Sequence, residues 1–127
     1  MNIEKALRTR LTDELSAQIS ARCYPDHLPQ SPTYPAIAYR RSTVDPISKL
    51  SDDNGMTRAG FDVAVFSKSF DECVTVTDLV QAALQRYSGT VETIDIVDIS
   101  IDNLDEDYEP DWEVWQRTLD ITIWYRI

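Results

Sequence analysis

Several residue types that catalytic and cofactor-binding motifs require are scarce in this sequence. Its 127 residues include three glycines, two cysteines and one histidine. Gly55, Gly60 and Gly89 do not form a glycine-rich phosphate loop, and no nucleophile-elbow, zinc-protease or kinase motif is present. We therefore expect no catalytic residues, no cofactor and no metal ion.

The single histidine and the two cysteines do not combine into a metal-binding or nucleophilic motif. His27 lies in a proline-rich segment without partner ligands at zinc-like spacing, which favours a surface loop residue over a catalyst. Cys23 and Cys73 are fifty positions apart and belong to no CxxC pair. We expect both to be reduced, partly buried thiols.

Long apolar runs and basic residues are also scarce. No run approaches the ~18 apolar residues that span a bilayer, and residues 1–5 lack the apolar region of a signal peptide, so we expect a cytosolic chain with no membrane partner. Twelve basic residues against 22 acidic ones give a net charge of −10, which disfavours tight binding to nucleic-acid phosphates. Hydrophobic residues make up 43% of the chain, enough for one domain spanning residues 1–127.

The negative charge is concentrated in the last third of the chain. Residues 89–127 contain eleven acidic and two basic side chains. Carboxylates gathered on one surface repel DNA, although plain solubility is an equally good interpretation. The spacing of the acidic residues lacks the glycine and terminal glutamate of an EF-hand, which favours a solvated turn over a calcium site. The candidate acidic surface consists of Asp95, Asp98, Asp102, Asp105 and Asp107.

Two segments have the apolar spacing of amphipathic helices. The first is predicted over residues 3–19, where an apolar residue recurs at every fourth position. The second is predicted to begin at Ser69, with Glu72 completing a capping box, and to end at about residue 88 with Gly89 as its C-terminal cap. The apolar positions of the first helix are Ile3, Leu7, Leu11, Leu15 and Ile19.

Strand patterns occupy most of the remaining sequence. Residues 36–41 form a short β-compatible run, residues 52–55 a turn, and residues 61–67 an alternating strand. Two longer runs, residues 91–104 and 112–127, are joined by residues 105–111 and indicate a β-hairpin. In the first run the apolar phase slips after Ile96, which predicts a β-bulge.

These elements predict an α+β fold in the order α-β-β-α-β-β. We expect two layers, with both helices on one face of a mainly antiparallel sheet, a long C-terminal hairpin, and room for a short additional strand at Cys23 and Tyr24. The last strand could reach ~43 Å, whereas a domain of this length is ~36 Å across. The hairpin therefore either projects towards a neighbouring molecule or bends around its own core.

The same hairpin contains several large aromatic residues. Trp124 alternates with Ile121 and Ile123, so it lies on the opposite strand face, where tryptophan often anchors an interface. Core packing is the other interpretation for these side chains. The candidate interface residues are Tyr108, Trp112, Trp115 and Trp124.

Five segments together resemble the tail-completion, or tail-terminator, family of long-tailed bacteriophages and prophages, and the resemblance covers nearly the whole chain. After the N-terminal helix come Arg22–Pro25 and Tyr34–Arg40, which contains a Tyr-Pro pair before a strand. Phe61–Phe66 precedes the second helix. The hairpin then contains Asp107–Pro110 and ends with Leu119–Arg126.

The resemblance implies a small, non-enzymatic α+β subunit of the virion. Members of this family assemble, commonly as a hexameric ring, on the head-proximal end of the tail tube, where they stop tube growth and dock to the head connector. The implied partners are other copies of the chain, the tail-tube protein and the connector, and DNA passes without specific binding. The implied location is the head–tail junction, after assembly in the host cytoplasm. We hypothesise that the five acidic residues line the channel of such a ring.

A function of a different class also fits the charge. An acidic protein of this kind could mimic DNA and inhibit a DNA-processing enzyme, acting alone or as a dimer. A small hydrolase is the weakest interpretation, because no nucleophile and base can be paired in the sequence.

Overall fold

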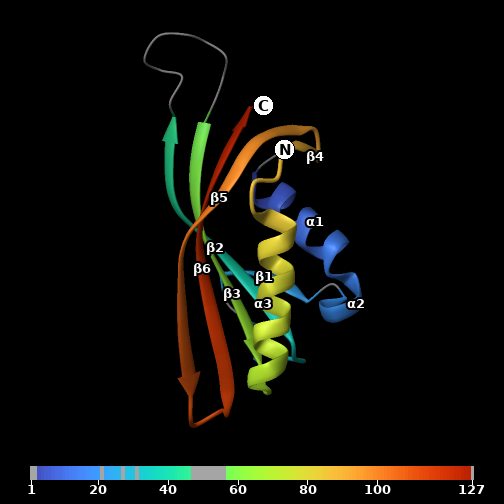
Figure 1. Cartoon of the computed structure of the whole chain (residues 1–127), viewed down its shortest axis with the longest axis vertical. Helices are drawn as coiled ribbons and strands as arrows, with labels where there is room; N and C mark the ends of the chain where they lie inside the picture. Colours follow the sequence, from blue (N-terminus) through green and yellow to red (C-terminus); the bar gives the residue numbers. More distant parts are fainter. Residues whose placement is uncertain (1–2, 21, 27, 31, 47–56, 127) are drawn as a thin grey trace.

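A computed structural model describes residues 3–20, 22–26, 28–30, 32–46 and 57–126 of the chain. These residues form a six-stranded sheet with helices against one side of it (Figure 1). In chain order the elements are α1 (Ile3–Glu14), α2 (Ser16–Ile19), β1 (Cys23–Pro25), β2 (Ala36–Pro46), β3 (Thr57–Ser67), α3 (Phe70–Leu84), β4 (Gly89–Val91), β5 (Ile94–Glu109) and β6 (Val114–Arg126).

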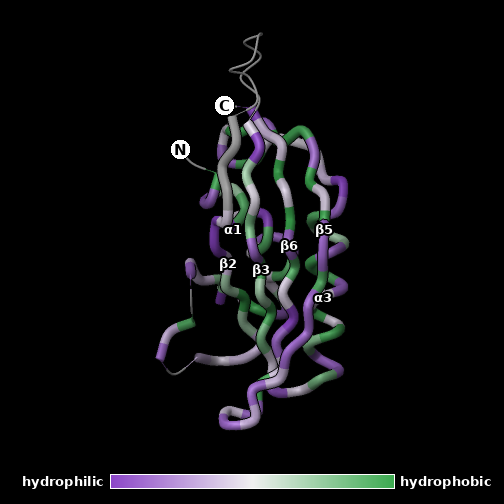
Figure 2. Tube along the Cα trace, turned by 90° about the vertical axis from the view of Figure 1, so that its left-hand side faces the viewer, coloured by the Kyte–Doolittle hydropathy of each residue, from purple (hydrophilic) through white to green (hydrophobic). Residues whose placement is uncertain are grey.

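The sheet is mixed, with the strand order β1-β2-β3-β6-β5-β4. β1 runs parallel to β2, and every other neighbouring pair is antiparallel. Figure 2 shows β2, β3, β6 and β5 side by side, with α1 and α3 behind them. The predicted α+β class is confirmed, and the short strand at Cys23 and Tyr24 is present as β1. The predicted order omitted β4 and treated α1 and α2 as one helix.

The N-terminal helix is interrupted at Leu15, which the sequence pattern did not predict. This residue has φ −116° and ψ 24°, so α1 ends at Glu14 and α2 begins at Ser16. The Leu15 N–H still donates to the Leu11 carbonyl oxygen at 2.9 Å, and the Leu15 carbonyl oxygen accepts from the Ile19 N–H at 3.0 Å, so hydrogen bonds connect the two helices across the break. The predicted apolar stripe is confirmed, since all five of its residues are buried.

Only one of the two hydrogen bonds of the predicted capping box forms at the start of α3. The Ser69 hydroxyl accepts a hydrogen bond from the Glu72 N–H at 3.4 Å. The Glu72 carboxylate, however, accepts from the Ser67 hydroxyl at 2.5 Å instead of returning to the Ser69 amide. The predicted end was also wrong. α3 ends at Leu84, and Gly89 begins β4 instead of capping the helix.

The strands are longer than the sequence pattern indicated. β2 continues to Pro46, whereas the predicted turn at residues 52–55 lies outside the described residues. β5 extends to Glu109, so most of the predicted connecting segment, residues 105–111, is strand. The β5–β6 hairpin reaches past the N-terminal end of α3 (Figure 1).

The core lies between the sheet and the helices. Phe61, Val63 and Val65 on β3 and Leu119 and Ile121 on β6 are buried on the face that α1 and α3 cover. Burying each such side chain contributes about 1.5–3 kcal/mol. The other side of the sheet, which carries no helix, is called the helix-free face below. None of the described helices is long and apolar enough to cross a membrane.

Both cysteines are free and buried, as predicted. Burial raises the pKa of the Cys23 thiol to about 12. Burial also raises the pKa of Cys73, whose Sγ lies 3.6 Å from the Val65 carbonyl oxygen. Both thiols therefore stay protonated at neutral pH.

Candidate functional site

The candidate acidic residues of β5 lie together on the helix-free face. Even-numbered residues of β6 from Gln116 to Arg126 lie on that face, because Leu119 and Ile121 are buried under the helices. Partners across an antiparallel pair project to the same face. The β5 residues opposite even-numbered β6 positions include Asp95, Asp98, Asp105 and Asp107, and the Asp102 carboxylate joins them by accepting a hydrogen bond from the Thr122 hydroxyl at 2.6 Å.

Two bulges in β5 bring these carboxylates to one face. Asp95 and Asp98 are three positions apart, so in a regular strand they would lie on opposite faces. The register shifts between Ile96 and Asp98, where the sequence predicted a bulge, and again between Ile101 and Asn103. The second shift was not predicted, and without it the acidic residues could not be assigned to one face.

The cations near this face form ion pairs only with the acidic residues in the first half of β5. Arg126 approaches Asp95 at 3.7 Å, and Arg86 approaches Asp98 at 3.0 Å. No lysine or arginine in the described part of the chain forms an ion pair with the remaining three β5 residues, Asp102, Asp105 and Asp107. These three are exposed, so the negative potential is strongest towards the hairpin turn.

A pair of carboxylates lies at the centre of the helix-free face. Asp62 on β3 is directly opposite Asp120 on β6. Burial raises the pKa of Asp62, and two effects of Asp120, the hydrogen bond that it accepts from protonated Asp62 and its charge repulsion, raise it further, while Arg40 at 3.7 Å partly opposes them. The sequence analysis did not identify this pair, because the two residues are far apart in the chain and become neighbours only through the β3–β6 register.

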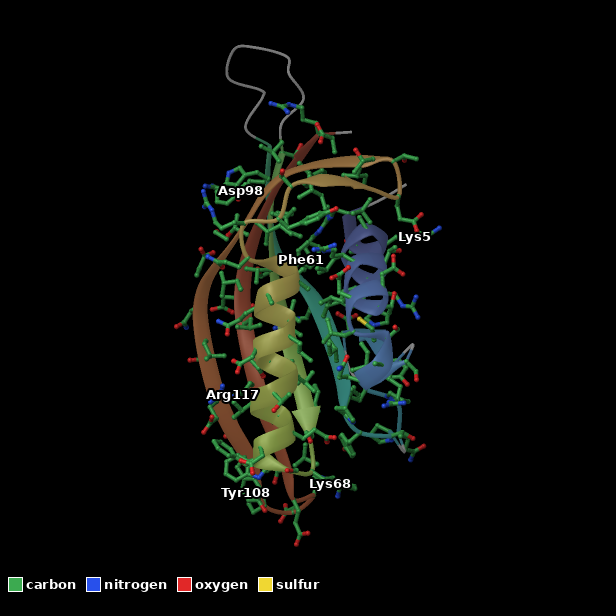
Figure 3. All side chains as sticks on the ribbon, turned by 45° about the vertical axis from the view of Figure 1, so that its right-hand side comes forward. Lys5, Phe61, Lys68, Asp98, Tyr108 and Arg117 are labelled. Atoms are coloured by element: carbon green, nitrogen blue, oxygen red, sulfur yellow. The ribbon has the colours of Figure 1, made fainter. Side chains whose placement is uncertain are left out.

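The hairpin turn and the start of α3 form an aromatic cluster. The Trp115 ring lies 4.9 Å from the Phe70 ring and 4.6 Å from the Tyr108 ring, measured between centroids. Arg117 stands over the Phe70 ring at 5.9 Å. Phe70 and Tyr108 are each 40% exposed, so the outer part of the cluster faces solvent. Figure 3 shows Tyr108 at the lower end of the molecule, with Arg117 above it.

Contacts with other segments hold the turn in place. The Lys68 ammonium donates to the Trp112 carbonyl oxygen at 2.7 Å and lies over the Tyr34 ring at 5.7 Å. A hollow of about 300 Å³ lies between the turn and the proline-rich loop, on the side of the sheet away from α3. Its lining includes Leu28, Pro29, Pro32, Phe66, Trp112 and Val114. No pattern in the sequence predicted that this loop meets the hairpin.

The candidate interface residues fall into three places. Tyr108 and Trp115 contact each other within the aromatic cluster. Trp112 is 67% exposed at the turn, beside the hollow. Trp124 is half-buried on the helix-free face, opposite Arg58 and Asp98. The sequence analysis missed Phe70 and Leu104, although both are large exposed hydrophobic side chains near the same end.

The groups gathered here suit repulsion of polyanions and contact with proteins. Carboxylates on an open sheet face lower the local concentration of anions, and partly exposed aromatic residues are typical interface anchors. Within the described ranges no three histidine, cysteine or carboxylate side chains are close enough to hold a metal ion. His27 lies outside those ranges.

Comparison with known proteins identifies similar chains. A family model described as tail completion protein gp17 matches residues 5–126. A chain in a solved structure titled virion of native gene transfer agent particle has 13% sequence identity and a TM-score of 0.67, with 97% of this chain and 96% of that chain covered. A second solved chain has 15% identity and a TM-score of 0.62, with coverage of 98% and 94%. No curated protein matches the sequence.

Proposed function

Because this chain belongs to the tail completion protein gp17 family, we propose that it completes the phage tail as a ring on the head-proximal end of the tail tube. The chain is a structural protein of the phage virion, with a role in the tail. In the proposed position the ring stops tube growth and docks to the head connector. Its partners there are other copies of the chain, the tail-tube protein and the connector.

The observation that carries this proposal is the common orientation of the five β5 carboxylates. A ring that closes with the helix-free face inward would present these residues to the channel. DNA carries a charge every ~1.7 Å of helix axis, so a negatively charged wall disfavours adhesion while the genome passes. The opposite face of the sheet is covered by α1 and α3, which would form the outer side of such a ring.

We assign the aromatic residues to contacts within this assembly. Tyr108, Trp112 and Trp115 at the hairpin end and Trp124 on the helix-free face are the proposed contact residues. A closed hexameric ring uses heterologous contacts between identical subunits, so each copy presents two different surfaces to its neighbours. Partly exposed tryptophan and tyrosine side chains are frequent anchors of such contacts.

Imaging of particles that lack this protein tests the proposal. Negative-stain micrographs of a deletion mutant should show overlong or headless tails, because nothing stops tube growth or forms the docking surface. Supplying the wild-type chain in trans should restore tails of normal length joined to heads. Full virions with normal tails in the deletion mutant would contradict the proposal and would favour the DNA-mimic interpretation.

A further inference from the structure

The outer edge of β5 is open along its second half. β4 pairs with β5 only from Ile94 to Ile96. The Arg86 N–H donates a hydrogen bond to the Ile99 carbonyl oxygen at 2.8 Å. From Ile101 to Glu109 β5 pairs with β6 on its inner side, and no described strand lies on its outer side (Figure 1). We call residues 101–109 the open edge. An edge of this length is a template for strand addition unless its side chains prevent it.

The side chains of the open edge differ between its two faces. On the face towards α3, Leu104, Glu106 and Tyr108 alternate, opposite Leu119, Arg117 and Trp115 of β6. Leu104 is 39% exposed, and Tyr108 rests on Trp115 while remaining 40% exposed. Glu106 already binds Arg117, with 2.8 Å between Arg117 Nη2 and Glu106 Oε1. This face therefore offers two apolar surfaces on either side of a satisfied ion pair.

The other face of the open edge offers negative charge. Asp105 and Asp107 lie there, opposite Thr118 and Gln116, and neither forms an ion pair within the described part of the chain. In an added strand, the residues directly opposite Asp105 and Asp107 would have their Cβ atoms about 4.5–5.5 Å from the Cβ atoms of these two residues. At that separation opposite charges attract and like charges directly opposite one another destabilise the pairing.

These features determine what kind of strand fits. Residues opposite Leu104 and Tyr108 should be apolar, those opposite Asp105 and Asp107 should be basic, and the residue opposite Glu106 can be polar. The fitting segment therefore reads apolar-basic-polar-basic-apolar. A second copy pairing through its own open edge would place carboxylate against carboxylate.

The other open edge of the sheet does not supply such a segment. Beyond Tyr39, β2 has no described strand on its outer side. The first two residues of this unpaired part of β2 are Arg40 and Arg41. Arg40 already pairs with Asp62 at 3.7 Å, and Arg41 with Glu4 at 3.2 Å. A basic segment of a different protein therefore fits the open edge better than a second copy of this chain does.

We propose that the open edge binds an extended basic segment of another protein as an additional strand of the sheet. Main-chain hydrogen bonds supply the general attraction, and the side-chain pattern supplies the selectivity. Leu104 and Tyr108 become covered, and Asp105 and Asp107 gain cationic partners. This interaction does not depend on ring formation, so it can be tested on the isolated chain.

A peptide titration followed by NMR tests the proposal. The probe is a capped peptide of sequence Val-Lys-Thr-Lys-Val added to the full ¹⁵N-labelled chain. We expect amide shifts concentrated at residues 101–109, and affinity about tenfold or more weaker in Asp105→Lys/Asp107→Lys, because two attractive pairs become repulsive. Asp13→Lys/Asp78→Lys changes the net charge equally at exposed helical positions and should leave the affinity unchanged.

Two further measurements keep the test decisive. Asp105→Asn/Asp107→Asn should also weaken binding, and spectra unchanged beyond the immediate neighbours of each substitution show that each variant is folded. A peptide N-methylated on every residue has no backbone N–H to donate in strand pairing and should not bind. Equal binding of that peptide, shifts centred elsewhere, or no shifts at all would overturn the proposal. Concentration-dependent shifts of the open edge without peptide would show that a second copy occupies it, which would also overturn it.

Discussion

Arg117 on β6 and Glu106 on β5 meet across the hairpin through a single carboxylate oxygen. The Arg117 Nη2 and Nε atoms lie 2.8 and 2.9 Å from Glu106 Oε1. The same guanidinium stands over the Phe70 ring at the start of α3. One side chain therefore connects both strands of the hairpin to the helix, at the place where the aromatic cluster reaches solvent.

Replacing this arginine should lower the free energy of unfolding measurably. The Arg117 side chain is 19% exposed, so its loss removes packing as well as charge. We expect Arg117→Ala to cost about 1–2 kcal/mol in urea unfolding. Arg86→Ala is the matched control, because the Arg86 side chain is 69% exposed in its pair with Asp98, and such pairs contribute about 0–1 kcal/mol. Equal losses in the two variants would contradict this account of the hairpin.

Ser67 should matter more for α3 than its position outside the helix indicates. Its buried hydroxyl donates to the Glu72 carboxylate and accepts the Ser69 N–H at 3.2 Å. Ser67→Ala removes the partner of both groups, so we expect a loss of about 1–2 kcal/mol in unfolding free energy. Ser88→Ala, at an exposed position, should change it by less than about 0.5 kcal/mol. A neutral Ser67→Ala variant would show that this link contributes nothing.

The carboxylate pair of the helix-free face should make stability depend on pH. Because the pKa of Asp62 is raised in the folded chain, the folded state holds this proton more tightly than the unfolded state does. The contribution of protonated Asp62 to the free energy of unfolding is therefore complete at pH values below the ordinary pKa of an aspartate. This contribution is lost as the pH rises through the raised pKa of Asp62 in the folded chain.

Asp62→Asn tests this pH dependence. We expect the variant to be more stable than the wild type at neutral pH, and the difference to vanish under acidic conditions, where Asp62 is protonated. Urea unfolding over a pH series measures the difference, with Asp78→Asn at an exposed helical position as the control. A stabilisation that grows on acidification would contradict the assignment.

Trp124 should contribute more to assembly than to the fold of the isolated chain. It is half-buried on the helix-free face, away from the main core. We expect Trp124→Ala to reduce ring recovery in cross-linked tails while the free energy of unfolding changes little. Leu119→Ala, which truncates a buried core residue, should cost about 2–5 kcal/mol of stability. Similar unfolding losses in both variants would identify Trp124 as an ordinary core residue.

Periodic burial is the part of this fold that the sequence predicts well. The stripe from Ile3 to Ile19 survives the break at Leu15, because the burial of each residue depends on its spacing and not on perfect helix geometry. The alternation from Leu119 to Tyr125 likewise specifies the buried face of β6. Both patterns are local, so they can be read without knowing what packs against them.

Features that depend on register or on distant partners could not be predicted. Asp62 and Asp120 become neighbours only when β3 pairs with β6, and the second bulge of β5 is marked in the sequence only by one three-residue step between apolar positions, from Ile101 to Leu104. The Glu72 carboxylate accepts a hydrogen bond from the buried Ser67 hydroxyl and not from the expected Ser69 amide, because the two donors compete for it. In each case the outcome is decided by a tertiary contact.

The orientation of the sheet in the assembled tail tests the central claim most directly. Cryo-electron microscopy of purified tails can resolve which side of each subunit faces the channel at the head-proximal end. The account predicts a ring in which the helix-free face, with Asp102, Asp105 and Asp107, lines the channel and α1 and α3 lie outside. A ring with the helices lining the channel and these carboxylates outside would contradict it.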